Sequence, residues 1–161
     1  MSAENIGIID IHSKGDYPSC ALSNFAGYEF CVDGVKCSSM EGFLQSLKFR
    51  NTAKQRQVCL LVGIEAKNAS RRGFSQLRWR VTHNLYWQGR RMSRYSDEYQ
   101  QLLDRAYSEL AQNEEFVNAL KSSCGNALVH SIGKTNTKET ILTEYEFVSR
   151  LEILREQLVS E

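Results

Sequence analysis

Three polar side chains spaced along one short apolar segment are the strongest chemical signal in this sequence. Glu41, Gln45 and Lys48 stand at positions i, i+4 and i+7 of the segment 39–50, so they share one face if the segment is helical. A carboxylate held beside an apolar wall can act as a base, as a nucleophile or as a stabiliser of a developing cation. A nearby lysine can clamp a phosphate or, if its pKa is lowered, form a Schiff base with a sugar aldehyde. The row therefore predicts a polar pocket with Glu41 and Lys48 as catalytic residues and Gln45 orienting both.

Ordinary structural roles are also open to these side chains. Ser38 and Glu41 have the spacing of a capping box, with Ser38 as the N-cap, and the local sequence favours this role. A single lysine is more commonly a solvated residue whose stem covers apolar surface. Gln45 fits a surface amide equally well. The capping and catalytic roles of Glu41 are compatible, because a glutamate in the first turn of a helix often faces a cleft.

A second group of candidates lies on segments that read as turns or loops. Ser23, Asn24 and Phe25 could line the same pocket, with Asn24 bonding to a base or ribose edge, although Ser-Asn also favours a simple turn. The polar loop 130–136 could cradle a phosphate with its backbone N–H groups, which makes His130, Gly133 and Asn136 candidates for substrate binding. A loop with no binding role is the default alternative. It lacks the glycine spacing and the Lys-Ser/Thr ending of a P-loop.

Aromatic and basic residues gather between positions 71 and 94. Trp87, with Trp79 and Tyr86, could stack on a planar base, although core packing is the commoner role of a tryptophan. Arginines next to aromatics suit phosphate recognition, and a solvated charged face explains them about as well. The arginines concerned are Arg71, Arg72, Arg78, Arg80, Arg90, Arg91 and Arg94.

Composition limits the classes of protein that this sequence can encode. The chain has 161 residues, which predicts one domain spanning 1–161. The net charge of +1 provides no global field for nucleic acid or an anionic membrane, although a local basic patch is compatible with it. Five cysteines without a CxxC pair indicate reduced thiols and a cytoplasmic location. No apolar run approaches the ~20 residues that span a bilayer, so no membrane association is expected.

Hydrophobic patterns predict an α+β fold that is predominantly α-helical. A short buried strand is expected at 6–11, and Asp33-Gly34 predicts a hairpin between the runs 28–32 and 35–37. Helices are expected at 39–50, at 54–65, from Asp97 onward and briefly around 116–120. Thr143 and Glu146 form a capping box ahead of the last helix. The segment 77–92 has no clear assignment. The histidines and cysteines show no metal-ligand spacing, and no GxSxG, GxGxxG or HExxH occurs, so neither a metal nor a cofactor is expected.

The span 22–49 resembles the NADAR superfamily, the group that includes the YbiA-like N-glycosidases. The family's hallmark is a Ser-Asn-Phe segment, an Asp-Gly hairpin and then Ser/Thr-x-Glu-x-x-x-Gln-x-x-Lys-Phe. The sequence carries these features at 23–25, at 32–34 and at 39–49. Many family members also have a Trp-Gly pair and a Gly-Lys-Asn-x-Leu-Gly run before the last helix. Here the corresponding stretch 130–142 has Gly133-Lys134-Thr135-Asn136 and no tryptophan, which suggests a divergent branch of viral type.

The resemblance implies a compact, mainly helical α+β domain and the hydrolysis of N-glycosidic bonds to ribose. Family members act on ribosylamino-pyrimidine intermediates of riboflavin synthesis or remove ADP-ribose from modified guanine bases. Carried over by position, Glu41 would be the catalytic carboxylate and Lys48 its partner at the ribose. Asn24, Phe25 and Gln45 would shape the pocket.

Three functions follow as hypotheses. The first is an N-glycosidase acting on an ADP-ribose or ribosyl-phosphate compound or on an ADP-ribosylated nucleic acid. The second is a non-catalytic module that binds ADP-ribose or another nucleotide, which the altered 130–142 stretch motivates. The third is a protein-interaction inhibitor on the same scaffold, which a large exposed apolar patch away from the cleft would favour. The oligomeric state is left open.

Overall fold

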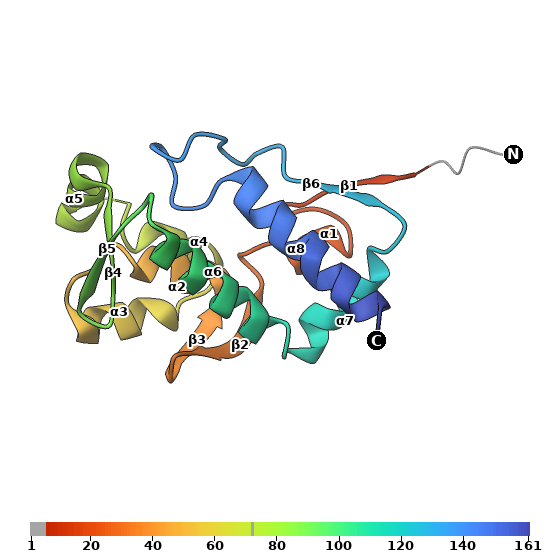
Figure 1. Cartoon of the computed structure of the whole chain (residues 1–161), viewed down its shortest axis with the longest axis horizontal. Coiled ribbons are helices and arrows are strands. Elements are labelled where there is room, and N and C mark those ends of the chain that lie inside the picture. Colours follow the sequence, from red (N-terminus) through yellow and green to blue (C-terminus); the bar gives the residue numbers. More distant parts are fainter. Residues whose placement is uncertain (1–5, 72) are drawn as a thin grey trace, which may run out of the picture.

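The computed structural model describes residues 6–71 and 73–161, and it is an α+β fold with more helix than strand (Figure 1). Arg72 lies outside the described residues. The strands pair into three small sheets of two strands each. In chain order the elements are β1 (Ile8–Asp10), α1 (Ser19–Leu22), β2 (Gly27–Val32), β3 (Val35–Ser39), α2 (Met40–Ser46), α3 (Thr52–Cys59), α4 (Gly63–Asn68), α5 (Phe74–Thr82), β4 (Asn84–Trp87), β5 (Arg90–Ser93), α6 (Asp97–Leu110), α7 (Glu114–Ser122), β6 (Ala127–Val129) and α8 (Glu144–Val159).

The β2–β3 hairpin forms where the Asp-Gly pair predicted it. Asp33 and Gly34 both have positive φ, of 48° and 83°, as a two-residue turn between twisted antiparallel strands requires. The Asp33 carboxylate also accepts hydrogen bonds from the Trp87 indole, at 2.9 Å, and from the Arg105 guanidinium, at 3.0 and 3.1 Å. The turn is therefore fastened to β4 and to α6.

Helix α2 is the central element of the fold, because it packs against β3, α3 and α4. Gly42 permits this close packing. A Cβ atom at Gly42 would lie 2.6 Å from the Leu61 carbonyl oxygen and 2.9 Å from that of Val58, distances that backbone atoms do not tolerate. On the other side, Phe43 and Leu47 are fully buried in the core. Helix α2 is thus fixed on both faces.

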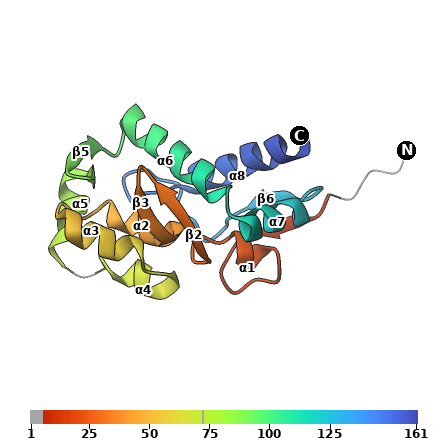
Figure 2. The ribbon, with the colours of Figure 1, turned by 90° about the horizontal axis from the view of Figure 1, so that it is seen from below.

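The C-terminal helices close the other half of the core. Helix α6 packs on β2, and α8 packs against α6, α7 and β6 (Figures 1 and 2). The apolar stripe of α6, which includes Tyr99, Leu103 and Tyr107, is buried as its helical spacing predicted. The capping box between Thr143 and Glu146 at the start of α8 is confirmed.

Two predicted elements differ in the structure. The helix expected at 54–65 is two helices, because the chain leaves α3 after Cys59 and Gly63 takes a left-handed φ of 60° at the start of α4. The strand expected to be buried at 6–11 is β1, which among the described residues pairs with β6 alone, in parallel, and leaves Ile8 72% exposed. The unassigned segment 77–92 holds most of α5, β4 and the first residues of β5. Within the described residues, no helix combines the length and apolarity needed to cross a membrane.

Candidate functional site

A cavity of about 390 Å³ lies between the start of α2, the loop ahead of β2 and the loop that leads into α8. Seven of the predicted site residues line it: Ser23, Asn24, Phe25, Glu41, Gln45, His130 and Gly133. Other residues complete the wall, among them Ser13, Leu44, Lys67, Ile132, Lys134, Thr143 and Phe147. Its volume falls in the range of pockets that hold small molecules.

The N-terminus of α2 places Glu41 at this cavity. The N-cap is Ser39, whose hydroxyl accepts from the Gly42 N–H at 2.9 Å and donates to the Leu61 carbonyl at 2.6 Å. The predicted capping box with Ser38 as N-cap is therefore wrong by one residue, because Ser39 also finds a partner across the chain. The Glu41 side chain does not serve as a cap. Its backbone N–H donates to the Asn24 carbonyl at 2.9 Å, which joins the 23–25 loop to the helix.

Two hydrogen bonds in series hold the Glu41 carboxylate. Gln45 Nε2 donates to Glu41 Oε1 at 2.9 Å, and Gln45 Oε1 accepts from the Ser70 hydroxyl at 2.7 Å. Gln45 and Ser70 are both buried, and Ser70 comes from the segment just after α4. Because an ionised carboxylate only accepts, Glu41 faces the nitrogen end of the Gln45 amide, and the Ser70 hydroxyl donates to the oxygen end that this leaves.

Burial raises the pKa of Glu41 above its ordinary value. The hydrogen bond from Gln45 and the positive charges of Lys48 and Lys67 oppose that rise. A carboxyl group with a raised pKa is a stronger base when ionised and is suited to accept a proton near neutral pH.

Lys48 lies close to Glu41 but is not among the described residues that line the cavity. Its side chain is only 7% exposed, and Nζ donates to Gln76 Oε1 at 2.8 Å. Burial lowers the pKa of Lys48 to about 8, while the Glu41 charge opposes this and the charges of Arg80 and Lys134 add to it. Lys48 is thus a buried cation behind Glu41 whose charge is lost at mildly alkaline pH.

Asn24 and Phe25 present different surfaces to the cavity. The Tyr107 hydroxyl donates to Asn24 Oδ1 at 2.9 Å, so the amide NH₂ of Asn24 points away from Tyr107, and it bonds to no described residue. This group can donate to a ligand in the cavity. The Phe25 ring is part of the wall, and Lys67 Nζ lies 5.9 Å from its centroid. An aromatic face and an exposed ammonium group therefore stand side by side at the rim.

His130 is held in one orientation by three contacts. Its Nδ1 lies 2.6 Å from the Ile11 carbonyl oxygen, which can only accept, so Nδ1 carries the hydrogen and Nε2 is the acceptor of the neutral ring. The ring packs edge-on against Phe147 at 5.1 Å between centroids. Gly133 packs over it so closely that a Cβ atom there would lie 2.5 Å from His130 Cδ2.

The structure places the remaining predicted site residues elsewhere. Trp87 packs on Phe43 at 5.2 Å between ring centroids and bonds to Asp33, so it belongs to the core around the hairpin. Asn136 is exposed, and its Oδ1 accepts from the Lys138 N–H at 3.0 Å within its own loop. Neither residue is in the wall of the cavity as the described residues define it.

The arginines of the 71–94 region also lie away from this cavity, as far as the structure describes them. Arg94 is 1% exposed and forms a buried ion pair with Glu146, with Nη1 and Oε2 3.1 Å apart. Arg94 Nε donates to the Thr140 carbonyl at 2.9 Å, and the Tyr99 hydroxyl donates to the Ile141 carbonyl. Arg94 thus supports the 140–143 wall from behind, and the cations that line the cavity are Lys67 and Lys134.

Sequence reasoning missed Ser70, Lys67 and Tyr107 as residues of the site. No local pattern marks them, because each reaches the site from a segment 25 or more residues away from the side chain it serves. Among the described residues, no group of three or more His, Cys, Asp or Glu side chains is arranged to hold a metal ion.

Comparisons with known proteins concern the fold and the ancestry of this chain. The structure of the E. coli protein YbiA, determined by NMR, is similar with a TM-score of 0.55 and 18% sequence identity, covering 96% of this chain and 86% of YbiA. This likeness confirms the YbiA-like fold that the resemblance implied.

The sequence comparisons point to bacteriophages. A 17.1 kDa protein from the gp30–rIII intergenic region of Enterobacteria phage T4 is 43% identical over 152 residues, which cover 93% of this chain and 98% of that protein. The expected relationship to viral proteins is thereby confirmed. The model of the family described as bacteriophage protein GP30.3 matches residues 16–156, and the chain belongs to this family.

Proposed function

We propose that this protein hydrolyses an N-glycosidic bond between a base and ribose in an ADP-ribosylated or ribose-phosphate compound. The observation that carries the proposal is the Glu41 carboxylate, which is held by Gln45 at the wall of a cavity with two lysines. The fold shared with YbiA supports it, since the resemblance to YbiA-like N-glycosidases includes the positions of Glu41 and Gln45.

The chemistry of this bond suits a fixed carboxylate. Cleavage builds positive charge on the anomeric carbon and the ring oxygen of the ribose. A carboxylate already oriented by Gln45 stabilises that charge without reorganising, which is the main source of catalysis in such sites. With its raised pKa, Glu41 can also take the proton of the attacking water.

The rest of the wall can bind the two ends of such a substrate. Lys67 and Lys134 provide ammonium groups for phosphate oxygens. Phe25 offers an aromatic face for the base, and the free amide NH₂ of Asn24 can donate to a carbonyl or hydroxyl of the ligand. Lys48 acts through its charge on Glu41, because its ammonium group is bound to Gln76.

The experiment is a test of bond cleavage with matched variants. ADP-ribose release from guanine-ADP-ribosylated DNA, and base release from a ribosylamino-pyrimidine phosphate, are measured for the wild type, for Glu41→Gln and for Glu65→Gln. Glu65 is an exposed glutamate on α4, so its variant controls for the loss of one charge. Cleavage by the wild type and Glu65→Gln, with a loss of about 10²-fold or more in Glu41→Gln, is expected. Full activity of Glu41→Gln would contradict the mechanism.

A second function, nucleotide binding without turnover, has one observation in its favour. Lys48 is turned to Gln76 rather than into the cavity, and the predicted loop residue Asn136 is outside it. Calorimetric titration with ADP-ribose distinguishes the two proposals. Measurable affinity, together with no cleavage in a single-turnover experiment at enzyme excess, would replace the first proposal with the second.

A further inference from the structure

The net charge of the chain is small, but basic and acidic residues are concentrated in different parts of the sequence. Residues 48–94 contain twelve lysines and arginines and a single acidic residue, Glu65. The rest of the chain contains eight lysines and arginines against eighteen acidic residues. A total of +1 is therefore the sum of a strongly basic part and a strongly acidic part.

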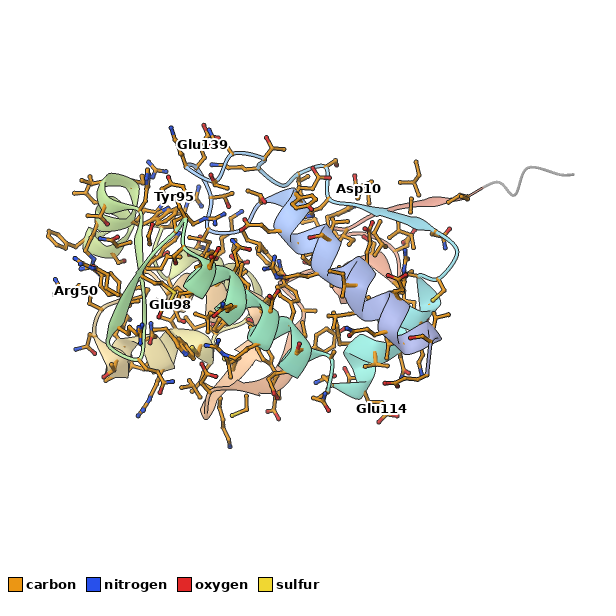
Figure 3. All side chains as sticks on the ribbon, viewed as in Figure 1. Asp10, Arg50, Tyr95, Glu98, Glu114 and Glu139 are labelled. Atoms are coloured by element: carbon orange, nitrogen blue, oxygen red, sulfur yellow. The ribbon has the colours of Figure 1, made fainter. Side chains whose placement is uncertain are left out.

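The fold gathers the basic part at one end of the molecule, where Glu98 of α6 also lies and pairs with Arg90 at 2.6 Å (Figure 3). Helices α3 and α5 and the β4–β5 hairpin lie at one end in both views, and α7 and the C-terminus lie toward the other (Figures 1 and 2). Figure 3 shows Arg50 at the first end and Glu114 at the second. We call the surface of 48–94 the basic end. Its exposed cations are Arg50, Lys54, Arg56, Lys67, Arg71, Arg80, Arg90 and Arg91.

Part of this charge is held in place by aromatic rings. The guanidinium groups of Arg50 and Arg78 lie 5.7 and 5.2 Å from the centroid of Tyr86, a ring that is only 8% exposed. Lys54 Nζ lies 5.9 Å from the Phe49 centroid. Of these cations, Arg50 and Lys54 are exposed, so the stacked groups remain available to an anion.

One donor in this cluster has no acceptor. Arg78 Nη2 donates to the Lys48 carbonyl at 2.9 Å, but Arg78 Nε is buried without a hydrogen-bond partner among the described residues. Arg78 is therefore held by the Lys48 carbonyl and by the Tyr86 ring.

An apolar face adjoins the arginines of the basic end. Phe74, Leu77 and Val81 follow one another at helical spacing along α5 and are 78%, 60% and 73% exposed. Exposed Arg71 precedes this helix, and exposed Arg80 lies on it. Arg80 lies three positions after Leu77 on the same helix, so the apolar face and a guanidinium group adjoin. An exposed aromatic ring and exposed arginines on one end of the molecule suit single-stranded nucleic acids, because the bases can stack while the phosphates pair with cations.

We infer that the basic end, through its exposed arginines and the exposed Phe74, binds single-stranded nucleic acid without sequence preference. The strand's phosphates meet the exposed arginines, and an unpaired base stacks on Phe74. A duplex is a poorer ligand, because its bases are already stacked on one another and cannot stack on Phe74. An acidic polypeptide is also a poorer ligand, because it has no comparable row of flat rings. Lys67 also lines the cavity at Glu41, but the other exposed cations of the basic end do not, and the proposed role does not depend on any glycosidase activity.

The test is the affinity for a fluorescein-labelled 20-nucleotide strand, measured by fluorescence anisotropy from 50 to 200 mM NaCl. The variant R71A/R80A/R91A removes three exposed cations of the basic end. The control K14A/K36A/K121A removes three exposed cations elsewhere and changes the net charge equally. Only the first variant is expected to weaken binding, by tenfold or more at low salt. It should also reduce the slope of log affinity against log salt by about 2, since each lost phosphate contact of a single strand contributes about 0.7.

Phe74→Ala tests the stacking contribution. It is expected to lower the affinity for single strands by about tenfold and to leave the salt slope unchanged. Single-stranded DNA, single-stranded RNA and a duplex of the same sequence form separate arms, and the duplex should bind more weakly than either strand. Circular dichroism and melting temperature confirm that each variant is folded.

Several outcomes would overturn the inference. One is that the two triple variants weaken the affinity for the labelled strand equally, and another is that the wild type does not bind that strand at 50 mM NaCl. A third is that polyglutamate displaces the labelled strand as strongly as the unlabelled oligonucleotide does. Equal affinity for duplex and strand, with no effect of Phe74→Ala, would do the same. Glu41→Gln is expected to bind as the wild type does, so failure of the glycosidase proposal and failure of this inference are separable.

Discussion

Gln45 donates from its amide nitrogen to Glu41 at 2.9 Å, and its amide oxygen accepts from the Ser70 hydroxyl at 2.7 Å. The side chain beside the candidate catalytic carboxylate is thus anchored by a residue 25 positions further along the chain. With the amide reversed, two oxygens would face each other and the carboxylate would lose its only side-chain donor among the described residues.

Ser70→Ala is therefore expected to impair catalysis although Ser70 touches no substrate. With Gln45 released, kcat should fall by about tenfold, by analogy with the loss of other positioned hydrogen bonds, and KM should change little. The acid limb of the pH–rate profile should move to higher pH, because the bond from Gln45 lowers the pKa of Glu41. Ser75→Ala, at a partly exposed serine on α5, is the control. An unchanged profile in Ser70→Ala would show that Ser70 serves packing alone.

Lys48→Met is expected to change both limbs of the pH–rate profile. The Lys48 charge favours ionised Glu41, so its removal raises the pKa of Glu41 and shifts the acid limb upward. In the wild type, Lys48 loses its proton as pH rises through about 8, and activity that depends on its charge falls there. The variant should lack this alkaline decline. The profile is measured from pH 5 to 10, and an alkaline decline that persists in the variant would assign it to another group.

Gly133→Ala is expected to disturb the site through His130. The added methyl group would lie 2.5 Å from His130 Cδ2, so the ring must move and its 2.6 Å bond to the Ile11 carbonyl is strained or lost. We expect KM for the substrate, or Kd for ADP-ribose, to rise by about tenfold, the cost of roughly one neutral hydrogen bond. Gly27→Ala is the matched control, because its Cβ would meet only Val62, at an ordinary 3.4 Å. Equal effects of the two substitutions would argue against a role of His130 in binding.

Arg94→Met is expected to destabilise the whole domain and not only the cavity. The substitution leaves Glu146 buried without its cation, which typically costs about 3 kcal/mol. Arg90→Met breaks the exposed pair with Glu98 and should cost less than about 1 kcal/mol. Urea unfolding at pH 7 measures both. A small effect of Arg94→Met would show that Gln100 and Thr143, which also donate to Glu146, satisfy it alone.

The same ion pair makes stability depend on pH. Burial acts to raise the pKa of Glu146, but hydrogen bonds from Arg94, Gln100 and Thr143 outweigh it, and its folded pKa lies below the ordinary 4.5. A lowered carboxyl pKa contributes stability that is complete above the unfolded value and is lost as pH falls through the folded value. The stability difference between wild type and Arg94→Met should therefore shrink as pH falls below the ordinary 4.5 and through the lower folded pKa of Glu146, as acid urea titrations would show.

Local chemistry was enough to predict several elements of this protein. The sequence alone determined features that depend on residues only a few positions apart. These are the Asp33-Gly34 turn, the apolar stripe of α6 and the capped start of α8. The shared face of Glu41 and Gln45 could also be predicted from the sequence, because a helix places residues i and i+4 on one face whatever surrounds it.

Only the tertiary structure decided which partners these elements meet. Ser39 rather than Ser38 caps α2 because the Leu61 carbonyl is within reach of its hydroxyl. Arg94 is a buried structural cation and Arg80 an exposed one, although sequence patterns do not separate them. Ser70 and Tyr107 join the site across 25 and 83 positions. Such contacts follow from how whole helices pack, and the spacing of residue types carries information only about the helix or strand in which they lie.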